Sequence, residues 1–241
     1  MKRAGVLIKG DIKNISRDPI LLMSVFVPLL VSLVMKFGLP FASGILMDEL
    51  AFDLTVYYEL IISIMLLVSP LMLGMLSGFI ILDEKDENLL TYYSITPLTK
   101  TGYLIYRMFF PIACGFVMTF FMIGIIGFVY IPFSRLLPIV LLVSMEAPMT
   151  ALVLGIFAAN KVEGLAISKA MGIFFFTPVA GYFIRSDWQL LAGIVPTYWI
   201  SKAYIAGVNG LAAYWMYILA GMAVHLFYTY ILYRQFEKKA L

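Results

Sequence analysis

Six stretches of this chain are each apolar over the roughly 20 residues that an α-helix needs to cross the hydrocarbon core of a bilayer. Short polar clusters separate the stretches, which lie near residues 20–42, 59–82, 104–131, 136–159, 169–185 and 213–233. Hydrophobic residues make up 63% of the 241 residues and charged residues only 13%, about half the usual fraction in a soluble domain. We therefore predict an all-α integral membrane protein with six transmembrane helices, forming one domain over residues 1–241. The short fifth span contains Thr177-Pro178 and is expected either to cross the membrane with a kink or to be continued by backbone that is buried in the protein.

The distribution of lysine and arginine predicts which side of the membrane each loop occupies. With six spans both termini share one side, and that side collects thirteen of the seventeen basic residues. The other face keeps Lys36, Arg135, Arg185 and Lys202. Both termini are therefore predicted to be cytoplasmic, in a chain expected to reside in a bacterial or archaeal cytoplasmic membrane. The net charge of +3 is small and not gathered in an aromatic-rich patch, so nucleic-acid binding is not expected.

Residues 1–19 are expected to form an amphipathic helix at the membrane surface. Lys9, Lys13 and Arg17 recur every four residues, while Ile8 and its apolar neighbours follow another face. Such a helix can contact anionic headgroups and lipid tails together, so membrane lipid is an expected partner. It could equally be only a positively charged anchor for the first span.

The polar segment 83–97 follows the second span. Asp83 is placed to cap a helix, acidic residues occupy the first turn, and Pro97 marks the end. The pattern predicts a helix of about three turns with an apolar ridge containing Leu89 and Tyr93. That ridge could pack against the protein's own spans or against a partner.

Three joints resemble the permease subunits of ATP-binding-cassette (ABC) transporters of the type 2 exporter superfamily. They are Arg17-Asp18-Pro19 before the first span, the acidic run that ends in Thr96-Pro97, and Lys161-Val162-Glu163-Gly164-Leu165 before the fifth span. With the six-span plan, the resemblance covers essentially the whole chain.

The resemblance implies that residues 83–97 are a coupling helix that docks on a separate ABC ATPase subunit. The residues that it assigns to this contact are Glu84, Asp86, Glu87, Asn88, Leu89, Leu90 and Tyr93. Asn88 stands where the family commonly has glycine, although asparagine also tolerates unusual backbone angles. The resemblance further implies a second permease subunit, in a homodimer or heterodimer.

The family also places short re-entrant helices on the outer side between the last two spans. Residues 187–210 fit this plan, because their apolar runs are too short to cross the bilayer and Pro196 separates them. Tyr198, Trp199 and Tyr204 are expected at the outer headgroup level, either as an ordinary aromatic belt or with a role in gating.

The chain carries no G-x-x-x-x-G-K-[ST] phosphate-binding motif, so no cofactor is expected here and ATP with Mg²⁺ would bind the partner ATPase. Enzyme chemistry also lacks support, because there is a single histidine, His225, and a single cysteine, Cys114. We therefore expect a permease subunit of an ATP-driven exporter without catalytic activity of its own. The alternatives are an ion-gradient-driven secondary transporter or channel, an intramembrane enzyme, and a membrane scaffold.

Glu146 is the polar residue that most needs an explanation, because a carboxylate near the middle of a span costs about 2.5–3.5 kcal/mol on insertion scales. Its side chain should face protein or water. It could contact the transport pathway, pair across a dimer interface, or serve as a hydrogen-bonded structural acid. His225 is expected to bond a neighbouring helix.

Overall fold

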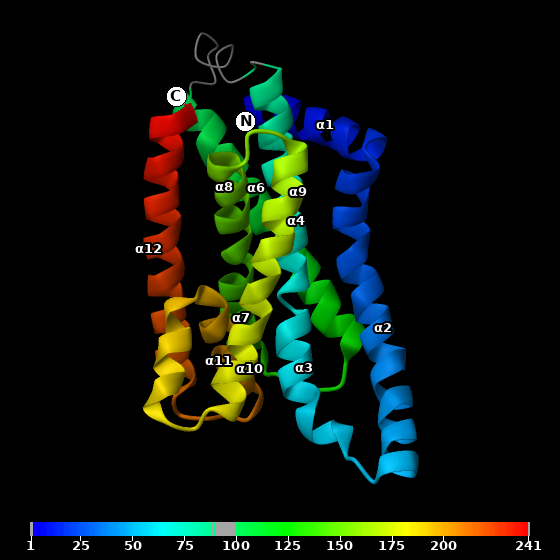
Figure 1. Cartoon of the computed structure of the whole chain (residues 1–241). Coiled ribbons are helices and arrows are strands. Elements are labelled where there is room, and N and C mark those ends of the chain that lie inside the picture. The colour runs from blue at the N-terminus through cyan, green and yellow to red at the C-terminus, as the bar shows by residue number, and fades with distance from the viewer. Residues whose placement is uncertain (1, 88, 90–99, 241) are drawn as a thin grey trace.

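The computed structural model describes residues 2–87, 89 and 100–240. This part of the chain is helical throughout its regular elements and contains six helical stretches that are long and apolar enough to cross a membrane. They are Pro19–Leu50, Leu54–Asp86, Gly102–Ile126, Phe133–Phe157, Lys161–Phe183 and Tyr214–Lys239. The predicted six-span, all-helical fold class is confirmed. Both termini lie at one end of the bundle (Figure 1), which we call the termini end.

Three spans are divided into two or three helical segments. The single-segment spans are α2 (Pro19–Leu50), α6 (Lys100–Ile126) and α12 (Tyr214–Ala240). The divided spans are η1 (Leu54–Tyr57), α3 (Tyr58–Met65) and α4 (Val68–Asp86); α7 (Phe133–Ser144) and α8 (Glu146–Phe157); and α9 (Lys161–Met171), η2 (Gly172–Phe175) and α10 (Phe176–Phe183). The elements outside these spans are α1 (Lys2–Arg17), η3 (Asp187–Ile194) and α11 (Pro196–Val208).

The second and fourth spans form the centre of the bundle. Their most apolar windows are 67% and 83% buried, whereas the other four spans are 22–28% buried. The contact between α4 and α8 depends on glycine: a Cβ atom on Gly74 would lie 2.5 Å from the Ala147 carbonyl oxygen, and one on Gly78 would lie 2.7 Å from Leu154. The two glycines are four residues apart, so they form one small-residue stripe on which α8 packs.

A proline occupies the third position of the second segment in each divided span. These residues are Pro70 in α4, Pro148 in α8 and Pro178 in α10. Proline lacks an N–H group and its ring clashes with the carbonyl four residues earlier, so the regular helix is interrupted before it. The interruptions fall at Leu66–Leu67, at Met145 and at η2, near the middle of each span.

The break before Pro178 shows how the protein satisfies a carbonyl that proline leaves free. The carbonyl oxygen of Phe174, four residues before Pro178, accepts hydrogen bonds from the Thr177 hydroxyl at 3.0 Å and from the Thr197 hydroxyl at 2.9 Å. Thr197 belongs to α11, so the bend in the fifth span is stabilised by the neighbouring segment. The kink predicted at Thr177-Pro178 is present, and its break begins at Gly172.

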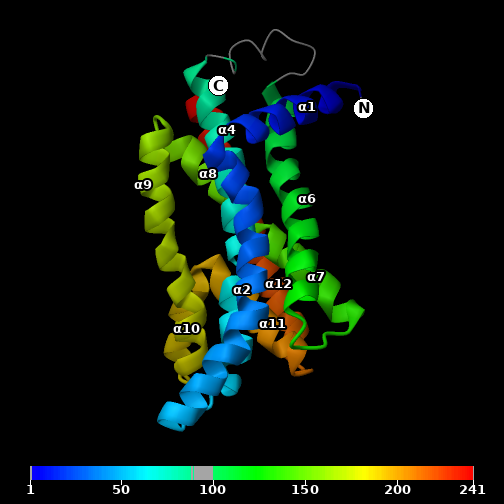
Figure 2. The same ribbon diagram turned by 90° about the vertical axis from the view of Figure 1, so that its right-hand side faces the viewer.

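Two groups of short elements lie at opposite ends of the bundle. At the termini end, α1 lies across the spans (Figure 2). This helix consists of residues that were predicted to be amphipathic. At the opposite end, η3 runs back toward the middle of the bundle, and α11 then returns toward that same end (Figure 1). The structure therefore has two short helical segments within the predicted re-entrant range 187–210.

We expect Gly74→Ala to lower the free energy of unfolding by roughly 1–3 kcal/mol, because the added methyl group would overlap the α8 backbone. Gly44→Ala is the matched control, since a Cβ atom there meets nothing within 4 Å. Thermal unfolding of the detergent-solubilised chain measures both. Equal stability of the two variants would contradict the close α4–α8 contact.

Candidate functional site

The three joints on which the family resemblance depends meet in one ion-pair cluster at the termini end. The Lys161 ammonium lies 2.6 Å from an Asp18 carboxylate oxygen and 2.9 Å from an Asp83 carboxylate oxygen. Asp18 also caps α2 by accepting hydrogen bonds from the backbone N–H groups of Ile20 and Leu21. Burial raises the pKa of the Asp18 carboxyl, but the hydrogen bonds from Lys161 and the backbone outweigh it and hold that pKa below its usual value.

A second and more deeply buried cluster surrounds Arg107 of α6. One guanidinium nitrogen donates to both carboxylate oxygens of Asp11 in α1, at 2.9 and 3.0 Å. The other side of the guanidinium pairs with Glu84 of α4, with Nε to Oε2 at 3.1 Å. Tyr106 donates to Asp11 and Tyr103 donates to Glu84. This Arg107 cluster connects α1, α4 and α6, and its three charged residues are at most 6% exposed.

Two lysines close the same end around the last turn of α8. Lys85 of α4 donates to the carbonyl oxygen of Gly155 at 3.0 Å, and Lys239 of α12 donates to that of Ile156 at 3.2 Å. The final carbonyl groups of a helix have no partner within the helix and carry partial negative charge, so cations are favoured there. The end of α8 is thereby tied to the central α4 and to the C-terminal helix.

The structure divides the residues assigned to the coupling helix. Asp86 and Glu87 are exposed at the end of α4, whereas Glu84 is buried in the Arg107 cluster. Leu89 is partly exposed, and Asn88, Leu90 and Tyr93 lie outside the described residues. Asp83 is not a helix cap as the sequence pattern suggested, because α4 continues without a break to Asp86.

Sequence analysis did not predict the pairing of Arg107 with Asp11. Both residues carried a signal that could have indicated it. Arg107 lies inside an apolar span, and Asp11 is the only acidic residue within a basic amphipathic helix. A charge inside a membrane segment requires a partner, and an acid on the buried face of the adjacent surface helix supplies one.

The two isolated polar residues of the spans, Glu146 and His225, bind each other. The His225 Nε2 atom lies 3.1 Å from a Glu146 carboxylate oxygen, and the side chains are 0% and 3% exposed. Glu146 is the first residue of α8, where the partial positive charge of a helix N-terminus favours a carboxylate. The Met145 break before Pro148 places that N-terminus near the middle of the fourth span.

The Glu146–His225 pair holds one proton between its two facing atoms. The other ring nitrogen, Nδ1, lies 2.7 Å from the carbonyl oxygen of Gly221, which can only accept, so Nδ1 carries a hydrogen. A hydrogen bond between Nε2 and Glu146 then requires one further proton, on the imidazole or on the carboxyl group. Both arrangements are neutral as a pair, which lowers the cost of burial.

The structure corrects the expectation for two aromatic residues of the segment 187–210. Tyr198 and Tyr204 are each 2% exposed, so they pack inside the protein and do not form an exposed belt. The Trp199 ring is partly exposed, and its indole nitrogen donates to the Gly193 carbonyl oxygen at 2.7 Å. The difference arises because α11 lies within the bundle, against α10 and α12.

Comparison with known proteins agrees with this architecture. Residues 11–233 match the model of the family described as fluoroquinolones export permease protein Rv2686c-like. The chain belongs to this family. Two relatives in Mycobacterium tuberculosis strains, the fluoroquinolones export permease proteins Rv2686c and MT2760, are each 32% identical over 239 residues. The match covers 96% of this chain and 92% of each relative. No solved structure matches.

Membership of the Rv2686c-like family makes the chain an export permease, a multi-pass membrane transporter and not an enzyme. The family also agrees with the resemblance to type 2 ABC exporter permeases. Both residues of the Glu146–His225 pair and all charged residues of the Arg107 cluster lie within the matched range 11–233.

We expect Arg107→Met to lower the free energy of unfolding by about 3–5 kcal/mol, because it leaves two buried carboxylates without their cation. Arg234→Met is the matched control: Arg234 is 3.6 Å from Glu237 on the surface, where a pair contributes about 0–1 kcal/mol. Chemical unfolding in detergent micelles compares the two. A similar small effect for both would show that the Arg107 cluster does not stabilise the termini end.

We expect His225→Phe to cost about 3–5 kcal/mol of stability, because Glu146 would then be buried without a partner. Adding Glu146→Met to that variant should recover part of the loss, since an apolar pair of similar volume needs no partner. A double-mutant cycle followed by thermal unfolding measures the recovery. A double variant that loses the sum of the two single effects would contradict the pairing.

Proposed function

We propose that this chain is the membrane-spanning subunit of an ATP-driven exporter, receives force from a separate ABC ATPase through residues 83–97, and works as a dimer of permease subunits. ATP and Mg²⁺ would bind the ATPase. The names of the relatives suggest fluoroquinolone-type drugs as cargo. The segment 83–97 would lie in the cytoplasm together with both termini.

The observation that carries the proposal is the arrangement of ion pairs around the ends of this segment. The segment leaves α4 beside Asp83 and Glu84 and returns into α6, seven residues before Arg107. Glu84 binds Arg107, and Asp83 binds Lys161 at the start of α9. These contacts connect the segment to the ends of the second, third and fifth spans, as a force-receiving element requires.

The same contacts suggest how the force would spread. A push on residues 83–97 acts on α4 and α6 together, because the Arg107 cluster holds them at fixed separation. The same push acts on α1 through Asp11. It acts on α9 and on the Asp18 cap of α2 through Lys161. The divided spans could then bend at their proline breaks, so that the two halves of the bundle move differently.

The experiment is affinity purification of the full chain from its native membrane in mild detergent. We expect a stoichiometric ATPase to copurify with the wild type. Changing Leu89 and Tyr93 together to aspartate should abolish this copurification, because two charges would then face the apolar groove proposed on the ATPase. The matched control changes Leu50 and Tyr130 to aspartate, the same residue types at exposed positions, at the end of α2 and in the turn between α6 and α7.

Two outcomes would overturn the proposal. One is an isolated wild-type chain that exports its cargo without any ATPase. The other is labelling of residues 83–97 from outside the cell, because no ATPase could then reach them. Equal loss of the ATPase in the control variant would show that the effect comes from general damage to the bundle.

An exporter driven by a proton gradient is the second candidate, and the Glu146–His225 pair is the observation that favours it. The pair holds a proton in the membrane interior and could exchange it if the two helices separated. The purified chain in liposomes would then transport cargo when a pH gradient is applied without ATP. Absence of such transport excludes this candidate.

A further inference from the structure

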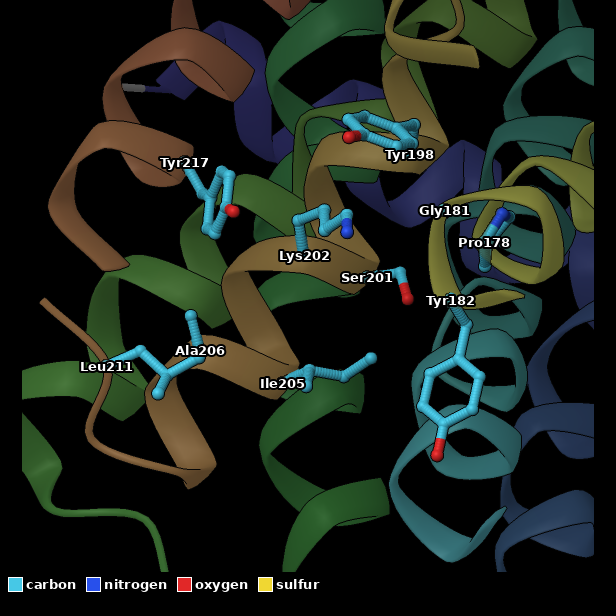
Figure 3. A pocket seen from close by; sticks show the side chains of 10 residues that line it. All are labelled: Pro178, Gly181, Tyr182, Tyr198, Ser201, Lys202, Ile205, Ala206, Leu211 and Tyr217. Carbon is cyan, nitrogen blue, oxygen red and sulfur yellow. The ribbon is translucent and has the colours of Figure 1, made fainter. Parts of the chain in front are cut away.

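A polar cavity lies in the half of the bundle away from the termini, between α10, α11 and α12. Its volume is about 210 Å³, and its walls include Tyr182, Tyr198, Ser201, Lys202 and Tyr217. Figure 3 shows the Lys202 ammonium directed into the space that these aromatic residues enclose. Gly181 of α10 makes room for it, because a Cβ atom there would lie 3.4 Å from Cε of Lys202 and 2.7 Å from the Tyr198 ring.

Lys202 has no hydrogen bond or ion pair with any residue that the structure describes. Its ammonium lies 5.6 Å from the centre of the Tyr198 ring, which is its one described electrostatic contact. No carboxylate lines the cavity. Other basic residues that reach into the described interior have hydrogen-bond partners: Arg107 pairs with two acids, and Lys85 donates to the carbonyl groups of Gly155 and Ala158. A partly buried cation in a membrane protein calls for an anion, and none of the described residues supplies one at Lys202.

Among the other polar groups of the cavity, one hydroxyl is without a described hydrogen-bond partner and others already form hydrogen bonds within the protein. The Tyr217 hydroxyl has no partner among the described residues, whereas Tyr198 donates to Gln189 and Ser201 is bonded to Ser63. An oxyanion beside Lys202 could therefore accept one charge-assisted bond from the ammonium and one bond from Tyr217. Figure 3 shows the Tyr198 and Tyr217 side chains around Lys202, whereas the Tyr182 ring extends away from it.

From these observations we infer that the cavity binds the carboxylate of an aromatic acid cargo on its way out of the bundle. The inference rests on the proposed export function and deepens it. At about 210 Å³ the cavity accommodates a carboxylate and its adjoining ring rather than a whole drug-sized molecule, for which pockets of roughly 300–1,000 Å³ are typical. A lipid phosphate offers the same oxyanion chemistry, and the experiment separates the two.

The test measures binding of ciprofloxacin and of its ethyl ester, in which the carboxylate is masked, to the full chain in phosphatidylcholine nanodiscs. The wild type should prefer the acid. Lys202→Met should bind the acid about tenfold more weakly or worse, the effect of losing one charge-assisted hydrogen bond, and bind the ester unchanged. Lys202→Arg should retain the preference. Lys36→Met is the matched control, because Lys36 is an exposed lysine outside the cavity.

Three results would overturn the inference: equal affinity of the wild type for acid and ester, an unchanged acid preference in Lys202→Met, or loss of that preference when phosphatidylglycerol is added, which would assign the site to a lipid phosphate. Failure of the proposed export function has a different signature. It would appear as absence of ATP-dependent ciprofloxacin export by wild-type cells, whatever the binding assay shows.

Discussion

Hydrocarbon offers no hydrogen-bonding partner, so polar groups within the bilayer have to find their partners inside the protein. This requirement explains contacts that otherwise look unrelated. The carbonyl group freed by Pro178 receives two threonine hydroxyls. Glu146 and His225, which come from spans far apart in the sequence, bind each other. Arg107 lies between two acids of different helices. Each pairing also selects which helices are neighbours, so the polar minority of residues specifies how the apolar helices assemble.

Sequence patterns predicted the elements more successfully than their contacts. Hydropathy is a property of consecutive residues, so the six spans could be found directly. Pro178 indicated a kink for the same local reason. The helix break before Pro70 was not predicted. The burial of Tyr198 and Tyr204 inside the protein was not predicted, because periodicity cannot reveal whether a short segment lies beneath other helices. The partners of Glu146 and Arg107 are 79 and up to 96 residues away. Each of these residues stood out in the sequence as a charge that needs a partner, but a single sequence does not show which distant position supplies it.

The three joints that carry the family resemblance lie next to one another in the folded chain. Arg17-Asp18-Pro19, the acidic run after the second span and Lys161 are each ordinary membrane-edge sequences, and each is only moderately specific by itself. In the folded chain, Asp18, Asp83 and Lys161 form one cluster that unites three spans. A short motif at a membrane edge can therefore be a component of a contact whose other components lie elsewhere in the chain. The individual motifs are better understood as parts of one ion-pair cluster at the termini end of the bundle.

The neutrality of the Glu146–His225 pair has an electrical consequence. Moving one elementary charge through the full membrane potential involves about 2.3 kcal/mol per 100 mV. A lone carboxylate at the start of α8 would make any displacement of that helix sensitive to voltage. Since the carboxylate travels with an imidazole that keeps the total at zero, α8 and α12 can shift together with little electrical work. A joint displacement of α8 and α12 should then move no net charge of this pair through the membrane field, whether or not the membrane is energised.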